Sequence, residues 1–181
     1  PYGYFSLSAA NDRDVVLRKL RAAIKAGDFK GGMAFIEQIY NDSKPKSTND
    51  AADVLSWDEL RALSQRGAAI AAHTHNHPLL TRIPFDEACA EIHHSQEVIR
   101  KEIGKALPVF AFPDGQPAFF SPALADFLKG EGIEFGVTTV DRTAVLSVEN
   151  AHHFPRVGIY PKLSLEAFAY RLTPFYKAFG N

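Results

Sequence analysis

Beyond residue 53, short apolar runs alternate with segments of helical periodicity, and this alternation limits the possible folds more than any other feature of the sequence. The runs at residues 68–72, 109–112, 135–140 and 157–160 predict strands, because they are short and bounded by turn or helix-stop signals. Single helices separate the strands along most of this region. Strands joined in this way pair in parallel, because a parallel neighbour needs a crossover connection. The sequence therefore predicts an α/β fold with a parallel sheet.

The helices of this region carry start and stop signals. Ser56, followed three residues later by Glu59, matches a capping box, and the helix that it opens is expected to stop at Gly67. The next helix has Pro84 in its first turn and is expected to stop at Gly104. Two further helices are expected over residues 121–130 and 164–174.

The beginning of the chain has a different pattern. Apolar residues spaced three and four apart predict helices over residues 12–26 and 32–40, and the polar stretch 41–53 predicts a surface loop. We therefore distinguish an N-terminal helical segment with its loop, residues 1–54, from a core, residues 55–181. Both are expected to belong to one globular domain, because 181 residues are few for two ordinary domains.

The balance of charges excludes some classes of partner. The chain has 20 Lys and Arg against 21 Asp and Glu, so it has no net basic field to hold nucleic acid or an anionic membrane. It has no apolar run of about 18 residues that would span a membrane and no signal peptide pattern, although a chain that begins at Pro1 is also consistent with a leader that has been removed. The lone Cys89 excludes an internal disulfide. A small molecule or a glycan is the expected partner.

Three histidines, His73, His75 and His77, directly follow the predicted strand 68–72. Active sites of α/β proteins gather on loops at the carboxyl ends of strands. Imidazole is a common zinc ligand, and two rings four residues apart can converge on one ion if the loop turns helically after the strand. We therefore predict that His73 and His77 bind a metal and that His75 points away from it.

The residues around this pair resemble a known family. Residues 55–83, LSWDELRALSQRGAAIAAHTHNHPLLTRI, resemble the second motif region of the polysaccharide deacetylases of the NodB-homology type, carbohydrate esterase family 4. In that family a helix, a glycine and an apolar strand precede His-Ser/Thr-x-x-His around a metal. His73 and His77 match the two histidines, and Thr74 matches the small hydroxyl residue.

Two further stretches extend the resemblance, which covers the chain from Leu55 to its end. FAFPDG, residues 110–115, is similar to the third motif of the family, an aromatic strand end that closes in Pro-x-Gly. FPRVGIY, residues 154–160, is similar to a Pro-Arg-Ile/Val stretch found in many bacterial members. The resemblance implies a (β/α)7-type barrel with parallel strands, here incomplete or distorted.

The resemblance also implies an activity, the metal-dependent hydrolysis of N-acetyl groups on an N-acetylhexosamine-containing polysaccharide. The metal, expected to be zinc with cobalt or nickel as alternatives, would be held by two neutral histidines and a carboxylate, and an aspartate would act as general base. The turn Pro113, Asp114 and Gly115 is implied to contact the substrate, with a backbone N–H near Asp114 stabilising the oxyanion. Arg156 is implied to orient a carboxylate or hold substrate, or else to be a structural ion-pair partner.

One departure from the family pattern is large, because no Asp-Asp pair occurs in the chain. In the family this pair supplies the base and the third metal ligand. Residues 5–10 could occupy its place with both carboxylates replaced. Alternatively, the helices over 12–40 match a helical insertion of the family and the motif lies upstream of Pro1, the alignment that we favour. The catalytic residues are therefore unassigned, and Asp114 and Asp141 are the carboxylates that could substitute.

The last family motif, Leu-x-x-His, is not recognisable either. Its histidine could be one of four others, for which structural or solvated roles are favoured: His93, His94, His152 and His153.

Three functions remain in competition at this point. The first is the metal-dependent deacetylase, of which this chain would carry an incomplete and inactive site. The second is a non-catalytic glycan-binding or interaction module derived from the deacetylase fold, and the third is an unrelated metallohydrolase built on His73 and His77. Loss of the first strand would leave an open sheet edge, which the N-terminal segment or a second copy of the chain is expected to cover as a homo-oligomer.

Overall fold

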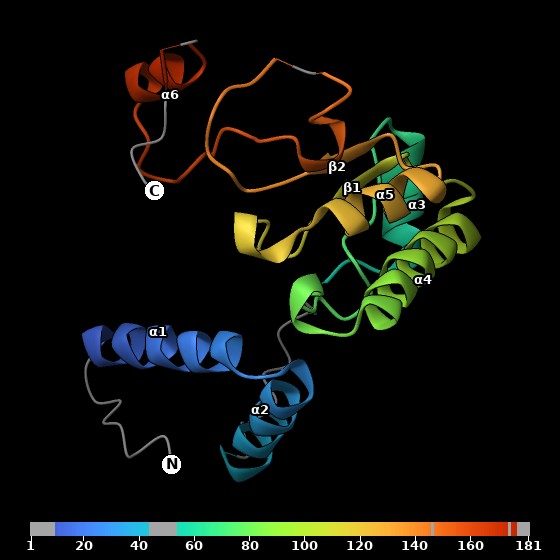
Figure 1. The fold of residues 1–181 in the computed structure, drawn as a ribbon. Helices are drawn as coiled ribbons and strands as arrows, with labels where there is room; N and C mark the ends of the chain where they lie inside the picture. The colour runs from blue at the N-terminus through green and yellow to red at the C-terminus, as the bar shows by residue number, and fades with distance from the viewer. Residues whose placement is uncertain (1–9, 44–53, 146, 174, 177–181) are drawn as a thin grey trace. The chain divides into compact units, whose positions relative to one another are not determined.

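The structure, a computed structural model, describes residues 10–43, 54–145, 147–173 and 175–176 (Figure 1). The chain divides into two compact units, residues 1–51 and 52–181, which are described separately. None of the described helices is long and apolar enough to cross a lipid bilayer.

The first unit consists of two helices that contact each other, α1 (Ala10–Ala26) and α2 (Phe29–Ser43). Both were expected from the sequence, but α2 is longer at each end than predicted, and residues 41–43 of the expected loop are helical. Asp28 accounts for the early start, since its carboxylate accepts a hydrogen bond of 2.8 Å from the backbone N–H of Gly31 in the first turn. The rest of the expected loop and residues 5–9 of the first-motif alternative lie outside the described residues.

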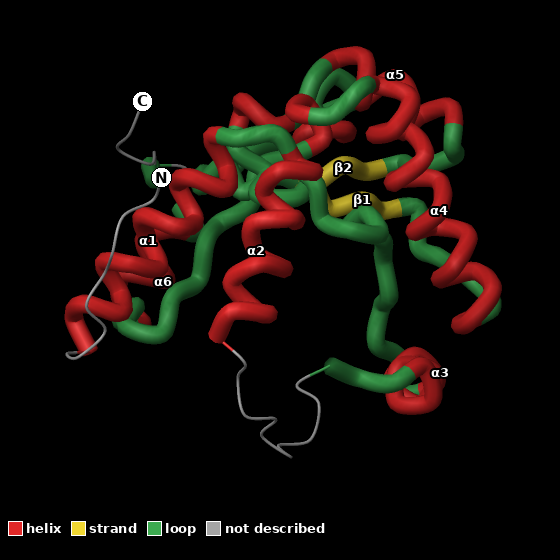
Figure 2. The backbone as a smooth tube through the Cα atoms, turned by 90° about the horizontal axis from the view of Figure 1, so that it is seen from below, coloured by secondary structure: helices red, strands yellow, loops and turns green. Residues whose placement is uncertain are grey.

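Four segments of the second unit pair in parallel and in chain order. β1 (Val109–Ala111) pairs in parallel with β2 (Phe135–Val137), and the two strands lie side by side in Figure 2. Ala72 forms a parallel bridge to β1 on its other side, and Phe154 forms one to β2. The predicted α/β fold with parallel strands is therefore confirmed. The described residues hold two strands and two bridges, an incomplete form of the expected barrel.

The core of this unit forms around β1, where Phe110 and Phe112 are 0% and 1% exposed. They pack against the buried faces of α4 (Phe85–Ile103) and α5 (Pro122–Gly130). Full burial of a large apolar side chain contributes about 1.5–3 kcal/mol. The core cluster consists of Ala72, Leu80, Ala88, Ile92, Ile99, Phe110, Phe112, Leu124, Leu128 and Ile133.

Gly136 of β2 is required by a close approach of the backbone. A Cβ placed there would collide with the carbonyl group of His152 and would lie 3.0 Å from the Phe112 ring. The segment that leads to Phe154 can therefore pack directly on β2.

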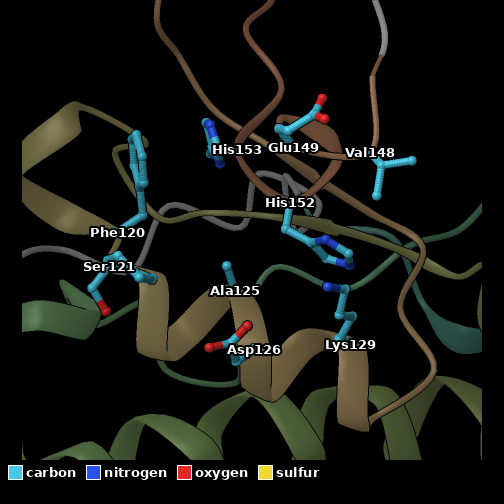
Figure 3. A pocket seen from close by; sticks show the side chains of 10 residues that line it. Phe120, Ser121, Ala125, Asp126, Lys129, Val148, Glu149, His152 and His153 are labelled. Carbon is cyan, nitrogen blue, oxygen red and sulfur yellow. The ribbon is translucent and has the colours of Figure 1, made fainter.

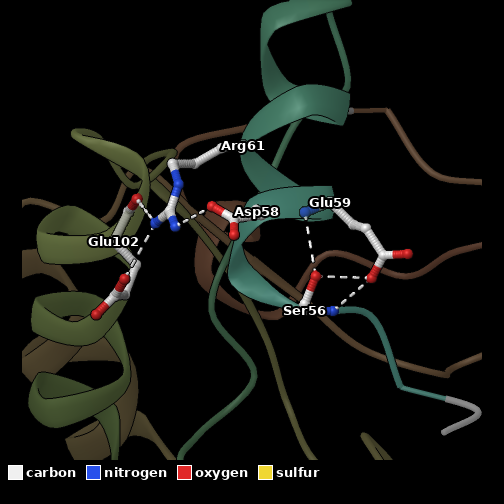
Figure 4. A network of polar contacts seen from close by, with 5 residues as sticks. All are labelled: Ser56, Asp58, Glu59, Arg61 and Glu102. Atoms are coloured by element: carbon white, nitrogen blue, oxygen red, sulfur yellow. Dashed lines mark hydrogen bonds and ion pairs between the residues drawn. The ribbon is translucent and has the colours of Figure 1, made fainter.

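The helix signals of the sequence are largely confirmed. Before α3 (Trp57–Gln65), the backbone N–H of Ser56 donates to Glu59 at 2.8 Å and the N–H of Glu59 donates to the Ser56 hydroxyl at 3.3 Å, which completes the capping box (Figure 4). Arg61 then attaches α3 to the end of α4, donating to the backbone carbonyl of Glu102 at 2.9 Å. Gly104 ends α4 in a left-handed conformation, as expected.

The N-terminal caps of α4 and of the last helix are Pro84 and Ser164. Pro84 is the N-cap of α4, one position before the expected first turn. Ser164 caps α6 (Leu165–Arg171) by accepting from the N–H of Ala167 at 3.2 Å. Three short 3-10 helices complete the described elements: η1 (Leu80–Arg82), η2 (Pro117–Phe119) and η3 (Ala151–His153).

The predicted strands 68–72 and 135–140 are shorter than expected. In the first, Ala72 is buried, whereas Ala68, Ala69 and Ala71 are exposed. This segment is therefore wrongly predicted as a buried strand, because among the described residues it has a strand neighbour only on the β1 side. The second strand ends at Val137.

The predicted strand 157–160 is wrong, and the pairing occurs three residues earlier, at Phe154. Side chains bind the backbone groups that a strand would need. The N–H of Gly158 donates to Asp141 Oδ1 at 3.0 Å, and its carbonyl oxygen accepts from Arg171 at 2.9 Å.

A histidine of α4 makes the stability of the second unit depend on pH. His93 Nδ1 lies 2.7 Å from a carboxylate oxygen of Glu131, and this hydrogen bond, with the charges of Glu131 and Glu97, raises the pKa of His93. A raised pKa adds stability below the unfolded pKa of about 6.5, and the stability is lost as the pH rises through the folded pKa. We expect His93→Gln to lower the thermal midpoint at about pH 6 and to leave it unchanged at about pH 9.

Thermal melts followed by circular dichroism test this expectation. In a Glu131→Gln background the effect of His93→Gln at the lower pH should largely disappear. An equal loss of stability at both pH values would contradict the ion pair.

Candidate functional site

Four loops leave the same end of the parallel segments and carry most of the residues singled out in the sequence. Residues 73–77 follow Ala72, residues 113–116 follow β1, and residues 138–142 follow β2. Residues 155–156 follow the bridge at Phe154. Because the segments are parallel, their carboxyl ends meet at one edge of the sheet.

His73 and His77 are in contact at this edge, with ring centroids 4.7 Å apart and ring planes at 77°. His73 Nδ1 lies 2.7 Å from the backbone carbonyl oxygen of Ala111, the last residue of β1. A carbonyl oxygen can only accept, so Nδ1 carries the proton, and Nε2 of the neutral ring keeps its lone pair. This is the state in which an imidazole can bind a metal ion.

The surroundings of His73 favour its neutral form. Partial burial of the ring lowers the pKa of His73, and the nearby charges of His77 and Arg156 act in the same direction. The hydrogen bond to the Ala111 carbonyl opposes this shift without reversing it.

The loop from Thr74 to His77 does not turn helically, yet it brings the two rings together. Thr74 and His77 both have a positive φ, 65° and 58°, on either side of a bend at residues 75–76. The Thr74 hydroxyl donates to the carbonyl oxygen of His73 at 2.5 Å and accepts from the N–H of His77 at 3.1 Å. Thr74 therefore links the two histidines through their backbones.

Glu91 of α4 also binds this loop. Its carboxylate accepts from the backbone N–H groups of His75 and Asn76 at 2.9 and 2.8 Å, and from the side chain of Asn76 at 2.7 Å. The His75 ring packs on His94 of the same helix, with centroids 4.4 Å apart. The sequence does not single out Glu91, because no local pattern connects a carboxylate on a helix to a loop that precedes it by fifteen residues.

The Pro113, Asp114 and Gly115 turn is fixed against the loop that follows β2. Thr139 donates through its hydroxyl to the carbonyl oxygen of Asp114 at 2.5 Å, and its N–H donates to the carbonyl oxygen of Gly115 at 3.0 Å. Asp114 and Gly115 have φ values of 58° and 67°, and a Cβ at Gly115 would lie 2.6 Å from the Thr139 nitrogen. Glycine is therefore required at position 115.

Asp141, one of the possible substitute carboxylates, is engaged elsewhere. Its Oδ1 accepts from the N–H of Gly158 at 3.0 Å, and its Oδ2 accepts from Arg171 at 2.9 Å and from the Tyr176 hydroxyl at 3.1 Å. The Arg171 guanidinium also lies over the rings of Tyr160 and Tyr176. Asp141 therefore holds α6 against the preceding loops and is not placed as a general base.

Among the described residues, His73 and His77 are not joined by a third His, Cys, Asp or Glu side chain that could complete a metal site. The other candidate histidines have different surroundings. His93 pairs with Glu131, and His94 packs on His75.

His152 and His153 line a separate cavity of about 600 Å³ between the η3 region and α5 (Figure 3). The His153 ring stacks on Phe120 with centroids 6.0 Å apart, and His152 Nε2 lies 2.8 Å from the carbonyl oxygen of Ile133. Lys129 extends toward His152 in Figure 3, while Glu149 lies on the opposite rim. Neither His73 nor His77 lines this cavity.

Comparison with known proteins identifies one family. A family model described as polysaccharide deacetylase matches residues 15–134. The search of curated proteins gives no match.

Solved structures of deacetylases share the fold. A Streptococcus pyogenes deacetylase, PplD, in complex with acetate is 24% identical over 69% of this chain and 54% of that chain, with a TM-score of 0.60. A de-N-acetylase from Aggregatibacter actinomycetemcomitans is 17% identical over 72% of this chain and 61% of that chain, with a TM-score of 0.56. IcaB from Ammonifex degensii is 20% identical over 60% and 49%, with a TM-score of 0.51. The chain thus spans less than two thirds of the length of these structures.

The hydrogen bond between His73 and Ala111 predicts an observable tautomer. We expect His73 to be protonated at Nδ1 at neutral pH, because the Ala111 carbonyl oxygen accepts only from an N–H. Two-bond correlations between ring nitrogens and carbon-bound protons in the NMR spectrum distinguish the two tautomers. Protonation at Nε2 would show that the ring does not present a lone pair as we describe.

Proposed function

The chain belongs to the polysaccharide deacetylase family, and from that premise we propose that it forms the metal-binding part of a hydrolase that removes N-acetyl groups from an N-acetylhexosamine-containing polysaccharide. One observation carries the proposal. The rings of His73 and His77 meet at the carboxyl end of the parallel segments, and the Ala111 carbonyl leaves Nε2 of His73 able to bind a cation.

The chemistry of these donors fits a divalent transition metal. Neutral imidazoles suit zinc, cobalt and nickel alike, and a carbonyl partner on Nδ1 is a common outer contact of metal-binding histidines. When bound, such an ion supplies Lewis-acid polarisation of the acetamide carbonyl and of the attacking water. We assign His73 and His77 to hold it, with zinc as the expected ion.

The neighbouring loops supply positions for the substrate. The turn from Pro113 to Gly115 is rigidly held by Thr139, so a backbone N–H presented there needs little reorganisation to stabilise an oxyanion. We assign the oxyanion donor to the backbone N–H near Asp114, as the family resemblance implies; the neighbouring N–H of Gly115 donates to the carbonyl oxygen of Pro113 at 2.7 Å. Arg156, which follows the bridge at Phe154, is assigned to orient the glycan.

We assign no residue of this chain as the general base. The sequence has no Asp-Asp pair, and the Asp141 carboxylate is bound by Gly158, Arg171 and Tyr176. A positioned general base contributes about 10²–10⁴-fold to the rate. This chain is therefore expected to bind a metal ion but to catalyse deacetylation slowly.

Metal binding is the first test. We expect Co²⁺ to bind the purified chain and to produce visible absorption that is lost in His73→Ala and in His77→Ala, because each variant removes one of two ligands. His75→Ala is the matched control, since the His75 ring packs on His94 and should leave Co²⁺ binding unchanged. Equal Co²⁺ binding by the unaltered chain and by all three variants would exclude the histidine pair as the metal site.

Acetate release is the second test. We expect little release from chitooligosaccharides by the chain alone with Zn²⁺ or Co²⁺, about 10²–10⁴-fold below a form that carries the Asp-Asp carboxylates. Fast release that needs metal and disappears in His73→Ala would show that another residue of this chain acts as the base.

The engagement of Asp141 and the lack of an Asp-Asp pair favour a second candidate, a glycan-binding module that keeps the deacetylase fold without its chemistry. Binding of chitooligosaccharides without acetate release, unchanged by His73→Ala, would support this module over the hydrolase.

A further inference from the structure

We infer that Glu91 is a positioning residue, which holds the loop of residues 74–77 in the conformation that brings the rings of His73 and His77 together. The effect of Glu91 on metal binding rests on the proposed function. Its effect on the conformation of the loop does not. Glu91 is on α4, between the motif stretches 55–83 and 110–115 and outside both of them.

The loop depends on Glu91 for its backbone contacts. Three of the hydrogen bonds described for this loop end on the Glu91 carboxylate, two from the backbone N–H groups of His75 and Asn76 and one from the Asn76 side chain. One oxygen, Oε2, accepts both backbone groups, and Oε1 accepts the side chain. A carboxylate is the acceptor that suits three converging donors, because it can accept at both oxygens and has no proton to repel them.

The conformation of the loop needs such an anchor. Thr74 and His77, on either side of the two anchored residues, have positive φ values that side chains other than glycine adopt rarely. Residues held in sparsely populated conformations persist when their surroundings determine them strongly. Without Glu91, the loop would keep the hydrogen bonds of Thr74 but lose three others, and a change of φ at His77 would move its ring relative to that of His73.

The position of Glu91 is itself well determined. Its neighbours along the buried side of α4, Ala88 and Ile92, are both 0% exposed, so the helix cannot shift without disturbing the core. Glu91 is partly buried, which raises the pKa of its carboxyl, but the hydrogen bonds from Asn76 and His75 outweigh burial and lower it overall. Glu91 is therefore charged at neutral pH. Because α4 is fixed by the core, the hydrogen bonds of Glu91 hold the exposed loop in one position.

The test compares Glu91→Gln with Glu97→Gln. Glu97 is on the same helix, and its described partner is His93, at 3.4 Å. Glutamine keeps the size of Glu91 and one acceptor oxygen, but it replaces the other oxygen with an NH2 group that faces a loop donor, and it removes the negative charge. We expect amide hydrogen exchange at His75 and Asn76 to become about ten-fold faster or more, as for loss of a hydrogen bond to a charged acceptor. Co²⁺ affinity should fall about 10–100-fold, as for other outer contacts of metal sites.

Asn76→Ala is a second variant that leaves α4 intact. It removes one of the three hydrogen bonds, so its effect on exchange at His75 and on Co²⁺ affinity should be smaller than that of Glu91→Gln and in the same direction. Glu97→Gln should match the unaltered chain in both measurements.

The outcomes separate this inference from the proposed function. Unchanged exchange at His75 and Asn76 in Glu91→Gln would overturn the inference, as would faster exchange with unchanged Co²⁺ affinity. If the unaltered chain binds no Co²⁺, the proposed function fails. The inference is then decided by exchange and by the NMR cross-relaxation between the His73 and His77 rings, which must weaken in Glu91→Gln for it to stand.

Discussion

The backbone of Ala111 connects the sheet to the candidate site. Its N–H donates to the carbonyl oxygen of Ala72 at 3.0 Å, which joins the first parallel segment to β1, and its carbonyl oxygen accepts from the His73 ring at 2.7 Å. The same residue therefore pairs the strands and orients the first histidine after them. Any shift of β1 would move His73 as well, so the packing of Phe110 and Phe112 in the core bears directly on the site.

The parts of the fold that follow from local chemistry were predictable. The Ser56–Glu59 capping box and the left-handed Gly104 depend on residues within a few positions of each other. The parallel class followed from the order of strands and helices, which constrains connections without any knowledge of packing. His73 and His77 do follow a parallel-paired residue, Ala72, although the strand predicted before them is reduced to a single bridge. The family was inferred instead from the motif stretches 55–83, 110–115 and 154–160, and the match to residues 15–134 shows it.

The parts that depend on distant side chains were not predictable. Residues 157–160 have the apolar pattern of a strand, yet Asp141 and Arg171 take the backbone groups of Gly158, and the pairing moves to Phe154. Similarly, Glu91 and the Ala111 carbonyl act on the histidine loop across the fold, one from a helix and one from a backbone group that has no side-chain signal. In both cases a partner far away in the sequence competes with the local pattern.

The chain order of the four parallel segments has a consequence for how the sheet assembles. Among the described residues, each of the last three segments pairs with the one before it, so each of these three pairings closes a single connection between successive segments. The entropy of closing a loop grows only slowly with its length, and pairings between successive segments keep each loop short. The sheet can thus grow by adding one segment at a time as the polypeptide leaves the ribosome, with Ala111 in place to receive His73 once β1 has docked on the segment before it.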